Sequence, residues 1–121
     1  MTDVEIQQFL EDNGYPAHVV AGGREFLLRR YREFVAEVER GYEYGIHEYR
    51  HDLDLRAAIS TIGLDGEVAE EDERLAAMLT ETDQRVWESM AGAPFWDFGY
   101  PRNVRGRLLR DLRGLGLPGS Q

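Results

Sequence analysis

Two histidines and a glutamate lie close together near the middle of this chain of 121 residues. Residues 47–51 read HEYRH, so His47 and His51 are four positions apart and Glu48 follows the first histidine. On a helix, side chains at i and i+4 project from one face, and two imidazoles there can share a tetrahedral Zn²⁺. The glutamate can then act as general base on a zinc-bound water. These residues are therefore candidates for zinc-dependent hydrolysis, with His47 and His51 as ligands and Glu48 as base.

The pentapeptide resembles the signature of the zincin metalloproteases, and this resemblance implies a third protein ligand. In the longer metzincin form, a glycine and a third histidine would occupy the positions held here by Asp54 and Ala57. The one other histidine, His18, lies upstream. A glutamate within residues 67–73 could serve as a gluzincin-like ligand, although so acidic a chain offers such a glutamate by composition. The pattern therefore supplies no specific third ligand.

A helix must position the motif, and the apolar residues around it predict one. Eight of them follow one another at steps of three or four positions: Leu28, Tyr31, Val35, Val38, Tyr42, Ile46, Tyr49 and Leu53. At about 100° per residue they fall within a sector of roughly 80° on a helix. We therefore predict one long helix over about 23–53, or two nearly collinear helices with a bend at Gly41 and Gly45, which both weaken a helix.

The two histidines of the motif fall outside that apolar sector. His47 and His51 point to the opposite side of the predicted helix, which also carries Phe26 and Tyr44. A catalytic zinc needs a shielded site and oriented supporting groups. We therefore favour surface histidines in a protein without catalytic activity and without a cofactor, and keep a small zinc-dependent hydrolase as the alternative.

Shorter amphipathic segments predict further helices. Thr2 or Asp3 can cap a first helix, and Asp52 or Asp54 can cap a new helix that ends at Gly63. Two more are predicted, one from residues 65–66 onward and one over 102–115. No segment shows a convincing strand pattern. We predict an all-α fold: a single helical domain over residues 1–121, built as a compact bundle of five to six helices around the long central helix.

Composition restricts the partners of this chain. The 23 acidic residues outnumber the 14 basic ones, all arginines, so the net charge is −9, and cysteine is absent. Such a charge disfavours binding to nucleic acid or anionic membranes. The N-terminus lacks the basic and apolar regions of a secretory signal, and no apolar run approaches the length of a membrane helix. We expect a cytoplasmic protein that folds alone or as a small homo-oligomer.

Two segments are candidates for binding a basic protein partner. The first is an acidic helix start that carries Glu67, Glu70, Glu71 and Glu73. The second places Phe95, Trp96, Phe98 and Tyr100 before a run of arginines, and aromatic residues and arginine are enriched at interface hot spots. Both segments have structural alternatives, since carboxylates stabilise a helix N-terminus and aromatic residues can close the end of a bundle. The function we favour is a non-catalytic interaction protein of the immunity, antitoxin or inhibitor type.

Overall fold

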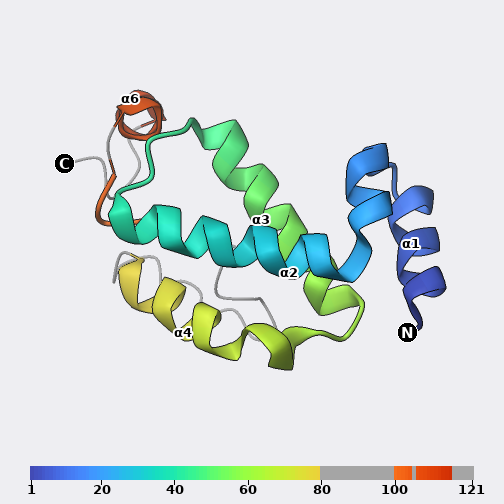
Figure 1. Ribbon diagram of the computed structural model, residues 1–121. Coiled ribbons are helices and arrows are strands. Elements are labelled where there is room, and N and C mark those ends of the chain that lie inside the picture. Colours follow the sequence, from blue (N-terminus) through green and yellow to red (C-terminus); the bar gives the residue numbers. More distant parts are fainter. Residues whose placement is uncertain (80–99, 105, 116–121) are drawn as a thin grey trace.

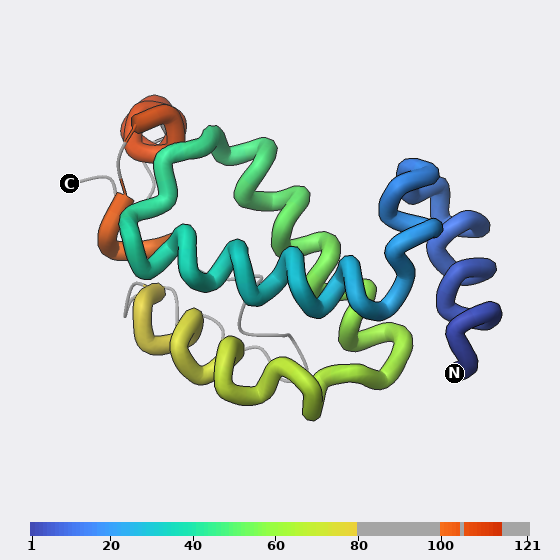
Figure 2. The backbone as a smooth tube through the Cα atoms, viewed as in Figure 1, coloured from blue at the N-terminus to red at the C-terminus, as the bar shows by residue number. Residues whose placement is uncertain are grey.

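The computed structural model confirms the all-α fold and describes residues 1–79, 100–104 and 106–115. These residues form five α-helices and one short 3₁₀ helix: α1 (Asp3–Asp12), α2 (Ala17–Arg40), α3 (Ile46–Thr61), η1 (Asp65–Val68), α4 (Ala69–Met78) and α6 (Gly106–Leu115). The long helix α2 is central, and α1, α3 and α4 all pack on it (Figure 1). α1 lies at one end of α2, and α6, which packs on α3, lies near the other end (Figure 2). No helix of these residues is long and apolar enough to span a membrane.

Of the two residues predicted to cap the first helix, Thr2 is the N-cap, and it forms a capping box with Glu5. The amide of Glu5 donates to Thr2 Oγ1 at 3.2 Å, and the amide of Thr2 donates to Glu5 Oε1 at 3.2 Å. This exchange satisfies two amides that the first turn of a helix leaves without partners. Ile6 and Leu10 of α1 are then buried against α2.

The long central helix is confirmed, but the predicted bounds of about 23–53 are wrong. α2 begins at Ala17 and ends at Arg40, because Gly41 takes a φ of 97°, which L side chains rarely adopt. The chain then reverses within residues 41–45, and α3 returns alongside α2 (Figure 1). The two helices therefore pack against each other and are not collinear. A separate helix after Asp52 or Asp54 is also not formed, since α3 continues to Thr61.

The apolar pattern nevertheless identifies the core correctly. Seven of its eight residues are buried, and Leu53 is half-buried. Between α2 and α3, the ring of Phe34 lies 5.7 Å from that of Tyr42 and 5.5 Å from that of Tyr49, and these two tyrosine rings are 5.5 Å apart. In the predicted helix from residues 65–66 onward, Val68, Leu75 and Leu79 are buried, and residues 80–99 lie outside the described residues.

A break at Gly23 divides α2. Its φ of 54° and ψ of −139° are not helical, and glycine adopts them without the steric cost that a Cβ imposes. The uninterrupted part of α2 therefore begins just after Gly23, close to the start that the sequence predicts. The six residues before the break, Ala17–Gly22, form an additional short helical segment.

A buried guanidinium group joins α2, α3 and α4. Arg56 of α3, with 2% of its surface exposed, pairs with Asp72 of α4 at 2.6 Å through Nη2 and at 2.8 Å through Nε. The same Nη2 lies 2.7 Å from Asp65, and Tyr31 of α2 donates its hydroxyl to Asp72 at 2.6 Å. Desolvation alone would lower the pKa of Arg56, but the hydrogen bonds with both carboxylates outweigh it and raise this pKa. The arginine is thus held in its charged form.

Helix α6 caps the start of α3. The amide of Ile46 donates to Asp111 Oδ2 at 2.9 Å, so a side chain from α6 replaces the local N-cap that Gly45 cannot provide. Arg107 adds an ion pair to Glu48 at 3.0 Å and donates its amide to the carbonyl of Glu43 at 3.0 Å. Leu108 and Leu112 of the predicted last helix are buried.

We predict that Asp111→Ala lowers the free energy of unfolding by about 1 kcal/mol, the usual loss when a capping oxygen is removed. Urea denaturation followed by circular dichroism measures it. Asp111→Asn is the matched control, because its amide oxygen can still accept from Ile46. An equal loss in both variants would show that charge, and not the capping acceptor, matters here.

We predict that the folded chain loses stability at alkaline pH because of two tyrosines in its core. Burial raises the pKa of Tyr31 above the ordinary 10.0, and its hydrogen bond to Asp72 adds to this; burial and the charge of Asp52 act in the same direction on Tyr42. Above about pH 10 the unfolded chain therefore releases protons that the folded chain retains, so stability is complete below pH 10 and falls above it.

The fall should approach about 1.4 kcal/mol per pH unit for each of these tyrosines. Denaturant titrations between about pH 8 and pH 11 measure it. In the variant Tyr31→Phe/Tyr42→Phe, the free energy of unfolding should fall less steeply with rising pH. Identical slopes for both proteins would contradict the assignment.

Candidate functional site

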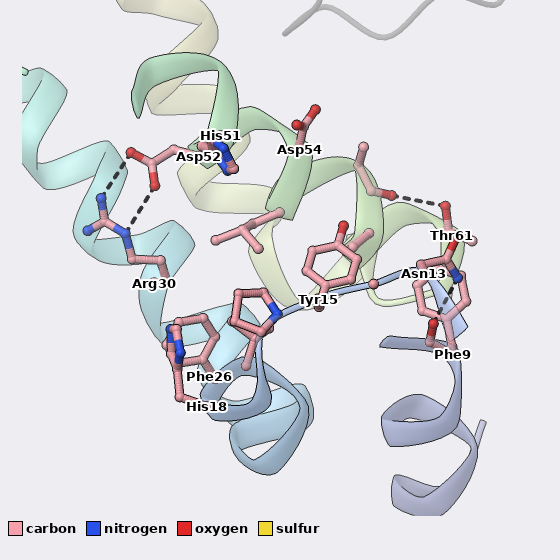
Figure 3. Close-up of a pocket in the computed structure, with 16 residues that line it drawn as sticks. Phe9, Asn13, Tyr15, His18, Phe26, Arg30, His51, Asp52, Asp54 and Thr61 are labelled. Atoms are coloured by element: carbon pink, nitrogen blue, oxygen red, sulfur yellow. Dashed lines mark hydrogen bonds and ion pairs between the residues drawn. The ribbon is translucent and has the colours of Figure 1, made fainter. Parts of the chain in front are cut away.

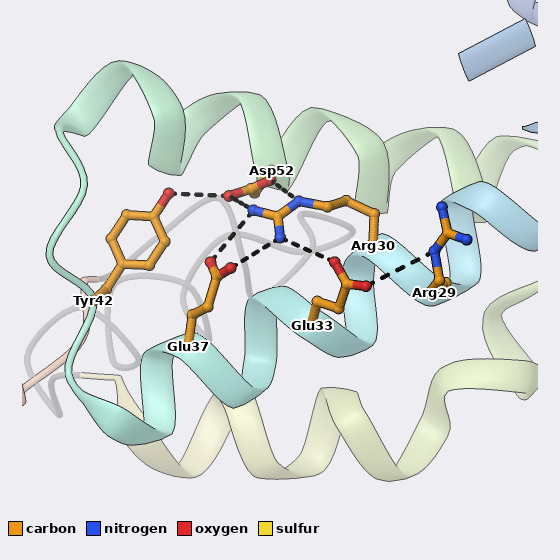
Figure 4. Close-up of polar contacts among 6 residues, drawn as sticks. All are labelled: Arg29, Arg30, Glu33, Glu37, Tyr42 and Asp52. Carbon is orange, nitrogen blue, oxygen red and sulfur yellow. Dashed lines mark hydrogen bonds and ion pairs between the residues drawn. The ribbon is translucent and has the colours of Figure 1, made fainter. Parts of the chain in front are cut away.

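A cluster of ion pairs lies between α2 and α3. Arg30 donates to Asp52 through Nε at 3.0 Å and through Nη2 at 2.9 Å, and its Nη1 donates to Glu37 at 3.0 Å. Tyr42 donates its hydroxyl to the same Asp52 at 3.0 Å (Figure 4). The Arg30 guanidinium is therefore bound by one carboxylate from each helix.

The charge of this cluster is negative. Glu33 also lies 3.6 Å from Arg30, so three carboxylates surround one guanidinium, while Arg29 reaches Glu33 from outside (Figure 4). Desolvation would lower the pKa of Arg30, but hydrogen bonding to Glu37 and the charge of Asp52 raise it overall. Desolvation raises the pKa of Asp52, and Arg30 opposes part of that rise. Arg30 is thus charged, and its charge is already compensated within the chain.

An open pocket of about 690 Å³, which we call the Tyr15 pocket, lies beside this cluster. Its walls come from the end of α1, the connection to α2, the first turns of α2, and α3 (Figure 3). This volume lies within the range of small-molecule and side-chain binding sites. Its apolar lining includes Phe9, Tyr15, Pro16, Val19, Phe26 and Leu55. His18, Arg30, His51, Asp52 and Asp54 are among its polar lining residues.

Asp54 differs from the other carboxylate of this pocket. Asp52 is buried and paired with Arg30, whereas Asp54 is exposed and makes no side-chain hydrogen bond or ion pair with another described residue. Burial raises the pKa of Tyr15, and the negative charge of Asp54 adds to this rise. The ring of Tyr15 and the carboxylate of Asp54, which has no described ion-pair partner, therefore line the same pocket.

A second hollow, of about 430 Å³, shares Arg30, His51 and Asp52 with the Tyr15 pocket and is called here the Tyr44 hollow. Tyr44 lines it and has 48% of its surface exposed. The helix side that the sequence assigned to Phe26, Tyr44 and the two histidines is therefore hollowed on both sides of the Arg30–Asp52 pair. In the described part of the chain it is largely accessible to solvent.

The HEYRH residues lie on one helix, as their spacing predicts. His47 and His51 of α3 are both exposed. Glu48 accepts a hydrogen bond from Arg107 at 3.0 Å, so its carboxylate is bound to α6. Among residues 1–79, 100–104 and 106–115, no group of three or more metal-binding side chains is close enough together to hold a metal ion. The described geometry therefore supplies two exposed imidazoles and no third zinc ligand.

The acidic segment formed by η1 and the start of α4 is partly neutralised by α2. Glu67 pairs with Arg24 at 3.1 Å, and Glu71, with 9% of its surface exposed, pairs with Arg32 at 3.6 Å. Only Glu70 and Glu73 of the four predicted partner-binding carboxylates are exposed without a side-chain hydrogen bond or ion pair to another described residue. A partner could reach these two and Glu67, while Glu71 belongs to the packing between helices.

The aromatic segment before α6 is described only at its end. Phe95, Trp96 and Phe98 lie outside the described residues. Tyr100 is half-buried, its ring centre lies 5.6 Å from that of Tyr49, and Arg50 donates to its hydroxyl at 3.3 Å. Tyr100 therefore packs against the end of the bundle, which is the structural alternative given for the aromatic segment.

The Tyr15 pocket was not found from the sequence. Its residues come from three separate segments, and no local spacing relates Tyr15 to Asp54. The one signal available was the helix side that carries Phe26 and His51, which do line the pocket. The sequence indicates that Phe26 and His51 share a helix side, but it does not indicate that this side forms part of a pocket.

No family model, no curated protein and no solved structure matches this chain. Function is therefore inferred from the residues and their geometry.

We predict that the HEYRH residues do not form a structural zinc site. The chain, purified without a histidine tag and dialysed against zinc, should retain well below one zinc per chain, because two exposed imidazoles hold zinc weakly without further ligands. Elemental analysis measures the metal, and the thermal midpoint should not change on adding a chelator. Stoichiometric zinc that is lost in His51→Ala would establish the alternative.

Proposed function

We propose that this chain is a non-catalytic interaction protein that binds a basic segment of another protein. The observation that supports it is a difference between the arginines and the carboxylates of the described residues. Seven arginines are in ion pairs within the chain: Arg24, Arg29, Arg30, Arg32, Arg56, Arg74 and Arg107. Seven carboxylates make no side-chain hydrogen bond or ion pair with another described residue: Asp3, Glu11, Glu25, Glu43, Asp54, Glu70 and Glu73. Internal pairing compensates the positive charge of these seven arginines, while the seven carboxylates remain available to a cationic partner.

Two surface regions combine such carboxylates with other binding features. One is the Tyr15 pocket, where Asp54 adjoins aromatic residues. The other is the acidic start of α4, where Glu70 and Glu73 are exposed. Because the positive groups of these regions already have partners in the chain, an approaching cation meets little repulsion.

A protein partner suits this surface better than nucleic acid. A net charge of −9 repels phosphates, whereas it accelerates encounter with a basic protein. An immunity protein, an antitoxin or an inhibitor of a basic enzyme would present such a surface. A cytoplasmic location is part of the same proposal, and so is the absence of catalysis.

We predict that selection from a random dodecapeptide library on immobilised full-length chain enriches peptides with a net positive charge. Binding of an enriched peptide, measured by fluorescence anisotropy, should weaken at least about tenfold when NaCl is raised from about 0.05 M to about 0.5 M, because salt screens exposed charges. Enriched peptides that are neutral or acidic, or whose affinity does not depend on salt, would contradict the proposed function.

The α4 surface is tested with the double variant Glu70→Lys/Glu73→Lys. Both side chains are exposed and make no described side-chain hydrogen bond or ion pair, so the fold should be kept, while the reversed charges should weaken a peptide bound there more than tenfold. The double variant Glu70→Gln/Glu73→Gln, which removes charge without reversing it, is the control. Unchanged affinity in the lysine variant would exclude this surface and direct attention to the Tyr15 pocket.

A further inference from the structure

The Tyr15 pocket joins three features that an acidic surface alone does not have. It is a hollow and not a flat face, aromatic rings line it, and its exposed carboxylate has no described ionic partner. We propose that it holds the guanidinium group of an arginine side chain from the basic segment bound by this protein. This inference rests on the proposed function and identifies where and how the partner is anchored.

Aromatic walls suit a guanidinium group. A cation over an aromatic face gains from the negative charge of the ring, and the planar guanidinium also stacks on it. Phe26 already has a cation nearby, since Arg29 Cζ lies 5.6 Å from its ring centre, and the ring centre of His18 lies 5.6 Å from that of Phe26 with the two rings nearly perpendicular. Tyr15 and Phe9 have no such contact among the described residues, so Tyr15 is the ring that we assign to the incoming arginine.

The charges around the pocket favour a cation over an anion. The positive group in its wall, Arg30, is bound by Asp52 and Glu37 and points into that ion-pair cluster (Figures 3 and 4). Asp54 stands on α3 across from the connection that carries Tyr15, and its charge acts on the Tyr15 phenol. Asp54 can therefore accept hydrogen bonds from a guanidinium group while Tyr15 contacts its face.

The shape of the pocket favours a side chain of a protein over a free small molecule. Dedicated small-molecule sites bury most of the ligand surface, whereas this pocket is open to solvent along one side. A side chain can insert into an open pocket while its backbone contacts the surface around the mouth. The Tyr44 hollow, which begins beyond the Arg30–Asp52 pair, offers such a neighbouring surface.

The first test measures binding of fluorescein-labelled nona-arginine to the full chain. Asp54→Asn should weaken binding about tenfold, because a charge-assisted hydrogen bond is lost. Tyr15→Leu should weaken it about three- to tenfold, and Tyr15→Phe, which keeps the ring face, should not. Asp3→Asn is the matched control, because it removes the same charge from an exposed aspartate outside both proposed binding regions, and it should weaken binding less than about twofold.

The second test maps the contact on the ¹⁵N-labelled chain. N-acetylarginine amide should shift the backbone amides of Tyr15, Phe26 and Asp54 in a saturable manner. N-acetylcitrulline amide, which has nearly the same shape without the charge, should leave them in place. Because Asp54 is exposed, Asp54→Asn keeps the fold and remains informative even if Tyr15→Leu unfolds the chain.

The outcomes separate this inference from the proposed function. If nona-arginine binds but Asp54→Asn and Asp3→Asn weaken it equally, or if the shifts centre on α4, the Tyr15 pocket is not the anchor and the interaction function stands. Equal shifts with the citrulline compound would also overturn the anchor. If the wild-type chain binds neither nona-arginine nor any selected basic peptide, the proposed function and the anchor fail together.

Discussion

The arrangement of the helices depends on one buried guanidinium group. Arg56 is almost completely removed from water, and such a transfer costs several kcal/mol unless carboxylates compensate it in good geometry. Asp72 of α4 and Asp65 of η1 provide that compensation, and Tyr31 of α2 completes the hydrogen bonding of Asp72. Hydrophobic contacts tolerate sliding, but these directional bonds do not. The relative positions of α2, α3 and α4 are therefore restricted by a single charged side chain.

The same physical rule operates nearer the surface and shapes the candidate site. Arg30 is half-buried between α2 and α3 and is compensated by Asp52, Glu37 and Glu33. The positive charge of this pocket wall is thereby compensated within the fold, while Asp54, two residues after Asp52 on α3, has no described ion-pair partner. An acidic chain that pairs most of its arginines internally presents carboxylates outside. This division of charge links the stability of the bundle to the proposed binding of a basic segment.

The reversal between α2 and α3 shows why a strong sequence pattern still gave a wrong connection. The apolar positions keep their helical period through residues 41–45, so the pattern continues as if one helix ran on. In the structure Tyr42 lies in the turn and still packs on Phe34 and Tyr49, because α2 and α3 bring their apolar sides together. Burial was predictable from the period. Whether Gly41 bends a helix or ends it depends on packing between helices.

The sequence by itself determined the all-α class, a cap at Thr2 or Asp3 for the first helix, most of the core, and the place of His47 and His51 opposite the apolar sector, but not whether these histidines are exposed. These properties follow from interactions over three or four residues and from the helical period, which any local segment contains. Only the tertiary structure decided that Asp111 caps α3, that Glu71 is buried, and that Tyr15 and Asp54 line one pocket. Each of these joins residues far apart in the chain, and their proximity depends on how buried charges and apolar faces are compensated together.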